Sequence, residues 1–134
     1  MKSKYVLLAS TMLISVATFA QKDQIKAAEK ALKAGKSDEA KTILLDAESV
    51  ITNATEAEKA QYYFVKGNVM LDLANKSVDK DANLSLAAGA FQELIEVEKA
   101  SGKSKYTAQA TKSVMDIKYK LINEAIADSK SDKH

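Results

Sequence analysis

The chain has 134 residues, 46% of them hydrophobic and 28% charged, which is typical of one globular domain and not of a disordered segment. It contains no cysteine, which excludes disulfide bonds, thiolate nucleophiles and cysteine metal sites. It has 20 lysines and 18 acidic residues. Two of the lysines and none of the acids lie in the first twenty residues, so residues 21–134 have no net charge. Arginine is absent and the lysines are interspersed with acids, so the composition argues against a nucleic-acid partner.

Residues 1–20 have the pattern of a signal peptide. Lys2 and Lys4 form a charged start, an apolar stretch runs from Val6 to Phe19, and a small-residue cleavage pattern ends at Ala20. A retained membrane anchor is the alternative, but an apolar stretch of about 15 residues is short beside the roughly 20 that a helical span needs. We therefore predict export to the periplasm or the exterior, with cleavage after Ala20.

The absence of proline and the presence of only four glycines favour helices throughout the rest of the chain. The first helix is predicted over residues 23–34, with Gly35 as a left-handed C-cap. Ser37 is predicted to be the N-cap of a second helix. The apolar positions of that second helix recur at helical spacing and are Ala40, Ile43, Leu44, Ala47 and Val50 or Ile51.

Three further helices are predicted. Thr55 with Glu58 three residues later forms a capping box that opens a helix reaching Ala74. The polar stretch of residues 75–83 is predicted to be a loop, followed by a helix from Ser85 to near Gly102. Ser104 is predicted to cap a last helix that runs past residue 121 to 126, and residues 129–134 are predicted to be a disordered tail.

Small residues recur in step along consecutive predicted helices. The first pair of helices contains Ala28, Gly35, Ala40, Leu44 and Ala47, the second contains Tyr63, Gly67, Ala87, Phe91 and Leu94, and the last helix contains Tyr106 and Ala110. Between residues 24 and 127 this pattern resembles the tetratricopeptide repeat, although the chain has neither the tryptophan nor the closing proline of that family. The resemblance implies an all-α domain over residues 21–128, with about two and a half stacked antiparallel hairpins, that binds a protein or peptide.

One stripe of the helix after Thr55 is predicted to face the groove of such a stack. The stripe is Gln61, Phe64, Asn68, Leu71 and Asp72, which combines a phenyl ring, two amides and an acid. Asn68 also matches one position of the carboxylate-binding members of the family, but Phe64 and Thr111 occupy the positions of the other binding residues. An ordinary solvated or core stripe is the alternative interpretation of these residues.

Metal binding and catalysis have little support in the sequence. Residues 79–85 resemble the start of a calcium loop, but Leu84 replaces the required glycine and Ala90 the bidentate glutamate. The only histidine is His134, so no serine–histidine–acid triad can be formed within the body of the chain. The glutamates at positions 93, 96 and 98 are interpreted as the exposed face of one helix. We therefore expect no cofactor, no metal and no enzymatic activity.

The sequence as a whole predicts an exported, non-catalytic scaffold that binds a protein or peptide. Two alternatives remain open: a helical carrier of a small ligand or lipid, and a structural self-assembly module of the cell envelope. Because the repeat pattern leaves the apolar residues of 106–126 without a following helix, the chain is expected either to continue into further repeats or to associate with a second copy through this segment.

Overall fold

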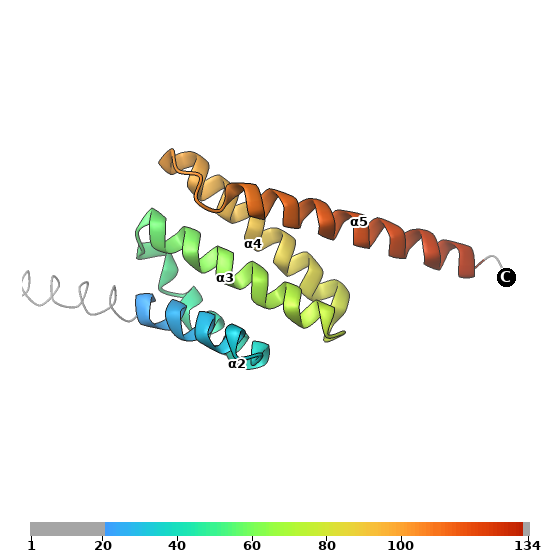
Figure 1. The fold of residues 1–134 in the computed structure, drawn as a ribbon, viewed down its shortest axis with the longest axis horizontal. Coiled ribbons are helices and arrows are strands. Elements are labelled where there is room, and N and C mark those ends of the chain that lie inside the picture. The colour runs from blue at the N-terminus through green and yellow to red at the C-terminus, as the bar shows by residue number, and fades with distance from the viewer. Residues whose placement is uncertain (1–20, 133–134) are drawn as a thin grey trace, which may run out of the picture.

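The computed structural model describes residues 21–132, and within them the chain is all-α, with no β-strand. Residues 21–33 form the first helix, which lacks a label in Figure 1. The elements that follow are α2 (Ser37–Glu48), the 3₁₀ turn η1 (Ile51–Asn53), α3 (Glu56–Asn75), α4 (Lys80–Ser101) and α5 (Thr107–Ser131). The all-α prediction is thereby confirmed for this part of the chain. The predicted signal peptide and His134 lie outside the described residues.

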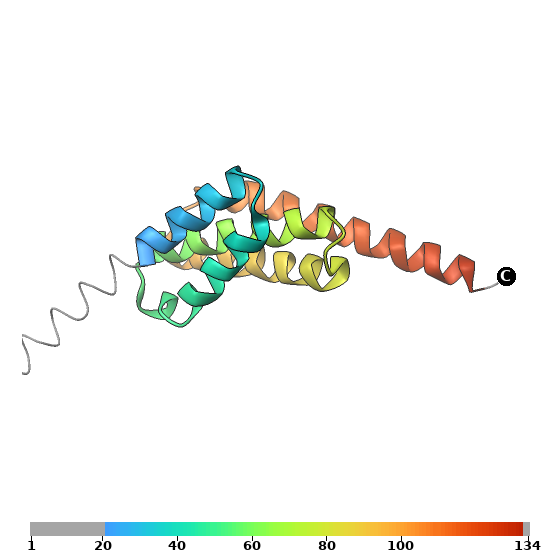
Figure 2. The ribbon, with the colours of Figure 1, turned by 90° about the horizontal axis from the view of Figure 1, so that it is seen from below.

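Consecutive helices run antiparallel and lie side by side (Figures 1 and 2). The helix of residues 21–33 forms a hairpin with α2, and α3 forms a second hairpin with α4. The most extensive contacts join α3 to α4, followed by those of α4 with α5 and of α2 with α3. The C-terminal half of α5 projects beyond the α3–α4 hairpin in both views.

The hydrophobic core is continuous across all the helices and depends on small residues where the helices cross. Ala28, Ala40, Ala87 and Ala110 are each fully buried, which allows their helices to approach closely. Gly67 is the tightest position, because a Cβ there would lie 2.6 Å from the Cε1 and Cζ atoms of Phe91. Gly67 therefore contacts the neighbouring helix α4 directly.

Several predicted helix ends are also confirmed. Thr55 accepts a hydrogen bond from the backbone N–H of Glu58 at 3.2 Å, and the Glu58 carboxylate accepts one from the Thr55 N–H at 3.0 Å, which completes the capping box. Gly35 and Gly102 have φ values of +77° and +70°, so both adopt the left-handed conformation that ends a helix.

The predicted loop of residues 75–83 is wrong in its second half. Helix α4 begins at Lys80 instead of Ser85, so Ser85 is not a cap. Asp79 turns the chain in the left-handed region, at φ 37°, and the buried side-chain amide of Asn83 donates a 2.7 Å hydrogen bond to the carbonyl of Val78. Asn83 therefore supports the turn from inside the helix, so a polar residue here marks a helix start and not a loop.

The predicted starts of two other helices are also wrong. Ser37 is the first residue of α2, not its N-cap, and its buried hydroxyl donates to the carboxylate of Asp72 on α3. Helix α5 begins at Thr107, three residues after the predicted cap Ser104. It continues through Ser131, so residues 129–131 are helical where a disordered tail was predicted.

No helix within residues 21–132 combines the length and the apolar character that a membrane span needs.

Candidate functional site

The five predicted groove residues all lie on α3, and all of them are half-buried. Phe64 stacks on Tyr106 at the start of α5, with ring centroids 4.3 Å apart and planes 19° from parallel. Leu71 lines a hollow of about 330 Å³ together with Ile117 and Tyr119 of α5. The part of the stripe with Phe64 and Leu71 therefore faces α5 and is partly covered by it.

Two polar members of the stripe are engaged within the protein. The Asn68 side-chain amide donates a 3.0 Å hydrogen bond to the carbonyl of Phe64, one turn earlier in the same helix. The Asp72 carboxylate accepts hydrogen bonds from Lys76, at 2.8 Å, and from Ser37. Those two donors lower the pKa of Asp72 below its ordinary value of 3.8. Asn68 and Asp72 thus already have partners inside the chain.

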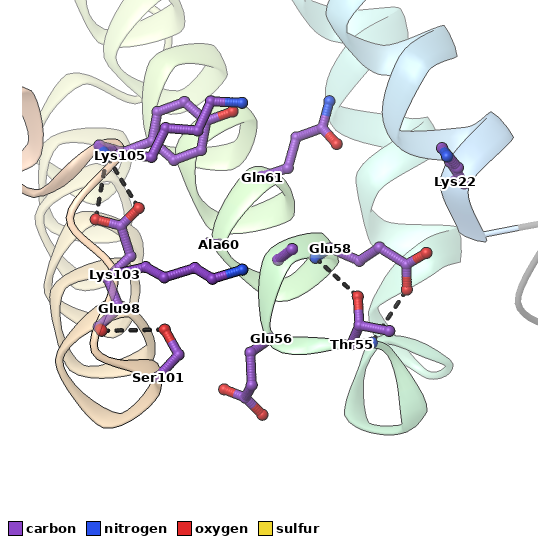
Figure 3. A pocket seen from close by; sticks show the side chains of 12 residues that line it. Lys22, Thr55, Glu56, Glu58, Ala60, Gln61, Glu98, Ser101, Lys103 and Lys105 are labelled. Atoms are coloured by element: carbon purple, nitrogen blue, oxygen red, sulfur yellow. Dashed lines mark hydrogen bonds between the residues drawn. The ribbon is translucent and has the colours of Figure 1, made fainter.

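Gln61, the remaining member of the stripe, lines a hollow of about 440 Å³ that we call the Lys103 pocket. The pocket lies between the first turns of α3, the connection from α4 to α5, and Lys22 of the first helix (Figure 3). Its apolar lining comes from Ala57 and Ala60 of α3 and from the ring of Tyr106. The Lys103 pocket and the hollow at Leu71 lie along the same side of α3, one on each side of the Phe64–Tyr106 stack, and we call them together the α3 groove.

Each acid of the Lys103 pocket is already paired. Glu58 belongs to the capping box of α3, and Glu56 lies 3.4 Å from the ammonium of Lys59. Glu98 is only 2% exposed, and its carboxylate accepts hydrogen bonds from the backbone N–H of Tyr106 at 2.9 Å and from the hydroxyl of Thr107 at 2.6 Å. Glu98 thus satisfies backbone and side-chain donors at the start of α5, which explains why the helix begins there and not at Ser104.

The interpretation of Glu98 as part of an exposed face is wrong, whereas Glu93 and Glu96 are exposed as predicted. The burial of Glu98 could have been predicted from the sequence. The buried positions of α4 recur at residues 87, 91 and 94, and the same spacing continues to residue 98. An acid that continues a core stripe at the end of a helix must find donors, and here it finds them at the start of the next helix.

The lysines of the pocket differ from its acids. The side chains of Lys22, Lys103 and Lys105 form no ion pair with any acid among residues 21–132. The Lys105 ammonium lies 5.1 Å from the centroid of the Tyr106 ring, in a cation–π contact. In Figure 3 the Lys103 side chain extends across the pocket toward Ala60. These positions were not predicted, because they come from two distant parts of the sequence, the first helix and the connection from α4 to α5.

Within the described residues, no group of three or more histidine, cysteine, aspartate or glutamate side chains could hold a metal ion. The resemblance of residues 79–85 to a calcium loop does not extend to the structure, since residues 80–85 are the first turns of α4. No protein-family model matches the chain, and neither a curated protein nor a solved structure matches it. What the protein does must therefore be inferred from the α3 groove itself.

Proposed function

We propose that the chain is an exported, non-catalytic scaffold of the tetratricopeptide-repeat type, which binds a segment of another protein in the α3 groove. The observation that carries the proposal is the groove, which consists of two hollows of about 440 and 330 Å³ along one side of α3. Lys22 of the first helix lines the larger hollow, and α5 lines the smaller one. Hollows that follow one another along a helix can accept side chains of an extended or helical segment.

The repeat assignment is supported by the packing between helices. Antiparallel neighbours, small residues at the crossings and the close contact of Gly67 with Phe91 are features that stacked helical hairpins need. Export is supported by the pattern of residues 1–20 and is tested by N-terminal sequencing of the exported form, for which Gln21 is the expected first residue. A protein that retains Met1 in the membrane fraction would contradict it.

A peptide is favoured over a lipid as the ligand of the groove. A lipid carrier needs an enclosed apolar cavity, whereas both hollows open to solvent and the larger one carries lysines, glutamates and an amide. The peptide ligand would combine apolar contacts with Ala57 and Tyr106 and polar contacts with Gln61.

The proposal is tested by selecting binders from a random-sequence peptide library displayed on phage. Ala57→Trp fills the Lys103 pocket from an exposed position of α3, so selected peptides should bind the parent protein and lose binding to this variant. The matched control is Ala82→Trp, which adds the same side chain at an exposed position of α4 that lines neither hollow. Peptides that bind both variants equally, or a library that yields no binders, would contradict the proposal. Binding of a lipid vesicle that Ala57→Trp abolishes would support the carrier instead.

A further inference from the structure

The Lys103 pocket has a surplus of unpaired cationic donors. Lys22, Lys103 and Lys105 come from two different parts of the fold and reach one hollow, yet none has an acid partner among residues 21–132. By number the lining is balanced, since Glu56, Glu58 and Glu98 also contribute to it.

The acids and the lysines of the pocket nevertheless differ in whether they already have partners. Glu98 is buried and accepts from two donors of α5, Glu58 accepts from the N–H of Thr55, and Glu56 lies beside Lys59. Each acid thus compensates a helix start or a lysine outside the trio. The ammonium groups of Lys22, Lys103 and Lys105 remain available to a ligand, and they are all donors without acceptor capacity.

The apolar part of the lining restricts what kind of anion fits. Ala57, Ala60 and the Tyr106 ring form a surface on which methylene groups can pack, and a volume of about 440 Å³ lies within the range of pockets that hold small ligands. A polyphosphate or nucleic-acid strand carries charge at every step and would place phosphates next to the glutamates. Glutamate and aspartate side chains carry one carboxylate each on a methylene stem, so a short acidic segment can match both the lysines and the apolar surface.

We propose that the Lys103 pocket binds an acidic segment of the partner protein, with carboxylates beside Lys22, Lys103 and Lys105. This inference rests on the proposed function and adds the chemistry of the ligand to it. Lys105 lies over the Tyr106 ring, which holds its ammonium at the edge of the pocket. The ring itself is fixed by the stack with Phe64, so part of the site is preorganised.

The direct test measures fluorescence anisotropy of a short fluorescein-labelled peptide with a run of glutamates, titrated with the purified protein. The same peptide with glutamines in place of the glutamates is the ligand control. We expect the glutamate peptide to bind, the glutamine peptide to bind at least tenfold more weakly, and the difference to shrink as sodium chloride is raised, because partly exposed charges are screened.

The site is tested with the triple variant Lys22→Gln, Lys103→Gln and Lys105→Gln. This variant should weaken binding of the glutamate peptide by roughly tenfold or more, because several partly exposed ion pairs contribute together. The matched control is Lys26→Gln, Lys118→Gln and Lys130→Gln, which removes the same charge from exposed lysines that do not line the pocket and should leave binding unchanged. All six lysines are exposed, so both triple variants should keep the parent melting temperature.

Four results would overturn the inference. If both triple variants weaken binding of the glutamate peptide equally, the peptide is attracted by the overall charge of the protein. If neither variant weakens binding, the peptide binds outside the Lys103 pocket. Equal affinity for the glutamate peptide and for free glutamate would mean that the pocket takes a small anion and not a segment. The fourth result is that library peptides without acidic residues lose binding to Ala57→Trp and keep it to the lysine triple variant. That result would support peptide binding in the pocket and reject an acidic segment as the ligand.

Discussion

The ring of Phe91 lies directly against the backbone of Gly67, so that a Cβ on residue 67 would come within 2.6 Å of two ring atoms. Phe91 is fully buried, and its ring cannot move without displacing its neighbours in the core. The absence of a side chain at residue 67 therefore allows α3 and α4 to pack as closely as they do.

Gly67→Ala should lower the free energy of unfolding by about 1–3 kcal/mol through overpacking, even though alanine favours helix by up to about 1 kcal/mol over glycine. Gly67→Leu should be more destabilising still. The matched control is Gly89→Ala in the interior of α4, where an added Cβ meets no atom within 4 Å, and it should raise stability. Urea unfolding of the variants measures both effects. Equal gains at the two positions would show that the contact with Phe91 does not constrain the fold.

The buried carboxylate of Glu98 gives a second prediction. Glu98→Ala should lower the free energy of unfolding by about 1–3 kcal/mol, because it leaves the N–H of Tyr106 and the hydroxyl of Thr107 without their acceptor. Glu96→Ala, at an exposed position on the same helix, serves as the control and should change stability by less than about 0.5 kcal/mol. Circular dichroism melting compares them, and similar losses in both would contradict the capping role.

The pKa of Asp72 gives a prediction about pH. Lys76 and Ser37 lower that pKa in the folded protein below 3.8, so the folded state binds protons less readily than the unfolded state. Asp72 then contributes stability above the unfolded pKa, and the contribution is lost as the pH falls through the lowered folded pKa. Because 37% of the side chain is exposed, the effect should stay below about 1 kcal/mol.

The measurement compares the parent protein with Asp72→Asn in chemical denaturation at a series of pH values. The parent should be the more stable one from neutral pH down to pH 4, and the two should converge at lower pH. Asp46→Asn removes an exposed acid of α2 without a salt bridge in the described residues and should show no such convergence. A difference between parent and Asp72→Asn that does not change with pH would contradict the assignment.

Self-association through α5 remains a prediction, and the structure defines the surface it would use. The inner side of the helix, with Ala110 and Ile117, is buried in the core. Outward-facing residues at spacings of four, three and four form an apolar stripe on the opposite side, with exposed fractions of 48–64%: Met115, Tyr119, Ile122 and Ile126.

If two copies associate through this stripe, the sedimentation mass should rise with concentration, and Ile122→Glu should return the protein to a monomer. Ala127→Glu places the same charge on an exposed flank of the helix, outside the stripe, and should leave the mass unchanged. A protein that stays monomeric at every concentration would contradict association through this stripe.

Much of the fold could be predicted because its signals are local. Helical spacing of apolar residues located every helix, and the capping box at Thr55 and the glycines at 35 and 102 fixed three helix ends. The starts of α4 and α5 could not be located in this way. They depend on a hydrogen bond that Asn83 donates and on hydrogen bonds that Glu98 accepts, and the burial of these two polar residues follows from packing and not from local preference.

The candidate site was predicted only in part, for the same physical reason. The spacing along α3 placed Gln61 and Leu71 on one stripe of the helix, and in the structure each of them lines one of the two hollows. It could not show that Asn68 and Asp72 are engaged inside the protein. Nor could it show that Lys22 and Lys103 line the same pocket, since these residues lie far apart in the sequence and are brought to one hollow only when the helices stack.

The projecting end of α5 has a consequence for local opening of the chain. Lys80 and Glu124 form the last ion pair that ties α5 to the rest of the described structure, and residues 125–132 are all exposed. Isolated helices shorter than about 12 residues are marginal in water, so these turns are helical only as an extension of the anchored part. Their amide protons should exchange with solvent far faster than those near Ile117, and slowing of that exchange would report, residue by residue, on anything that comes to cover the end of the helix.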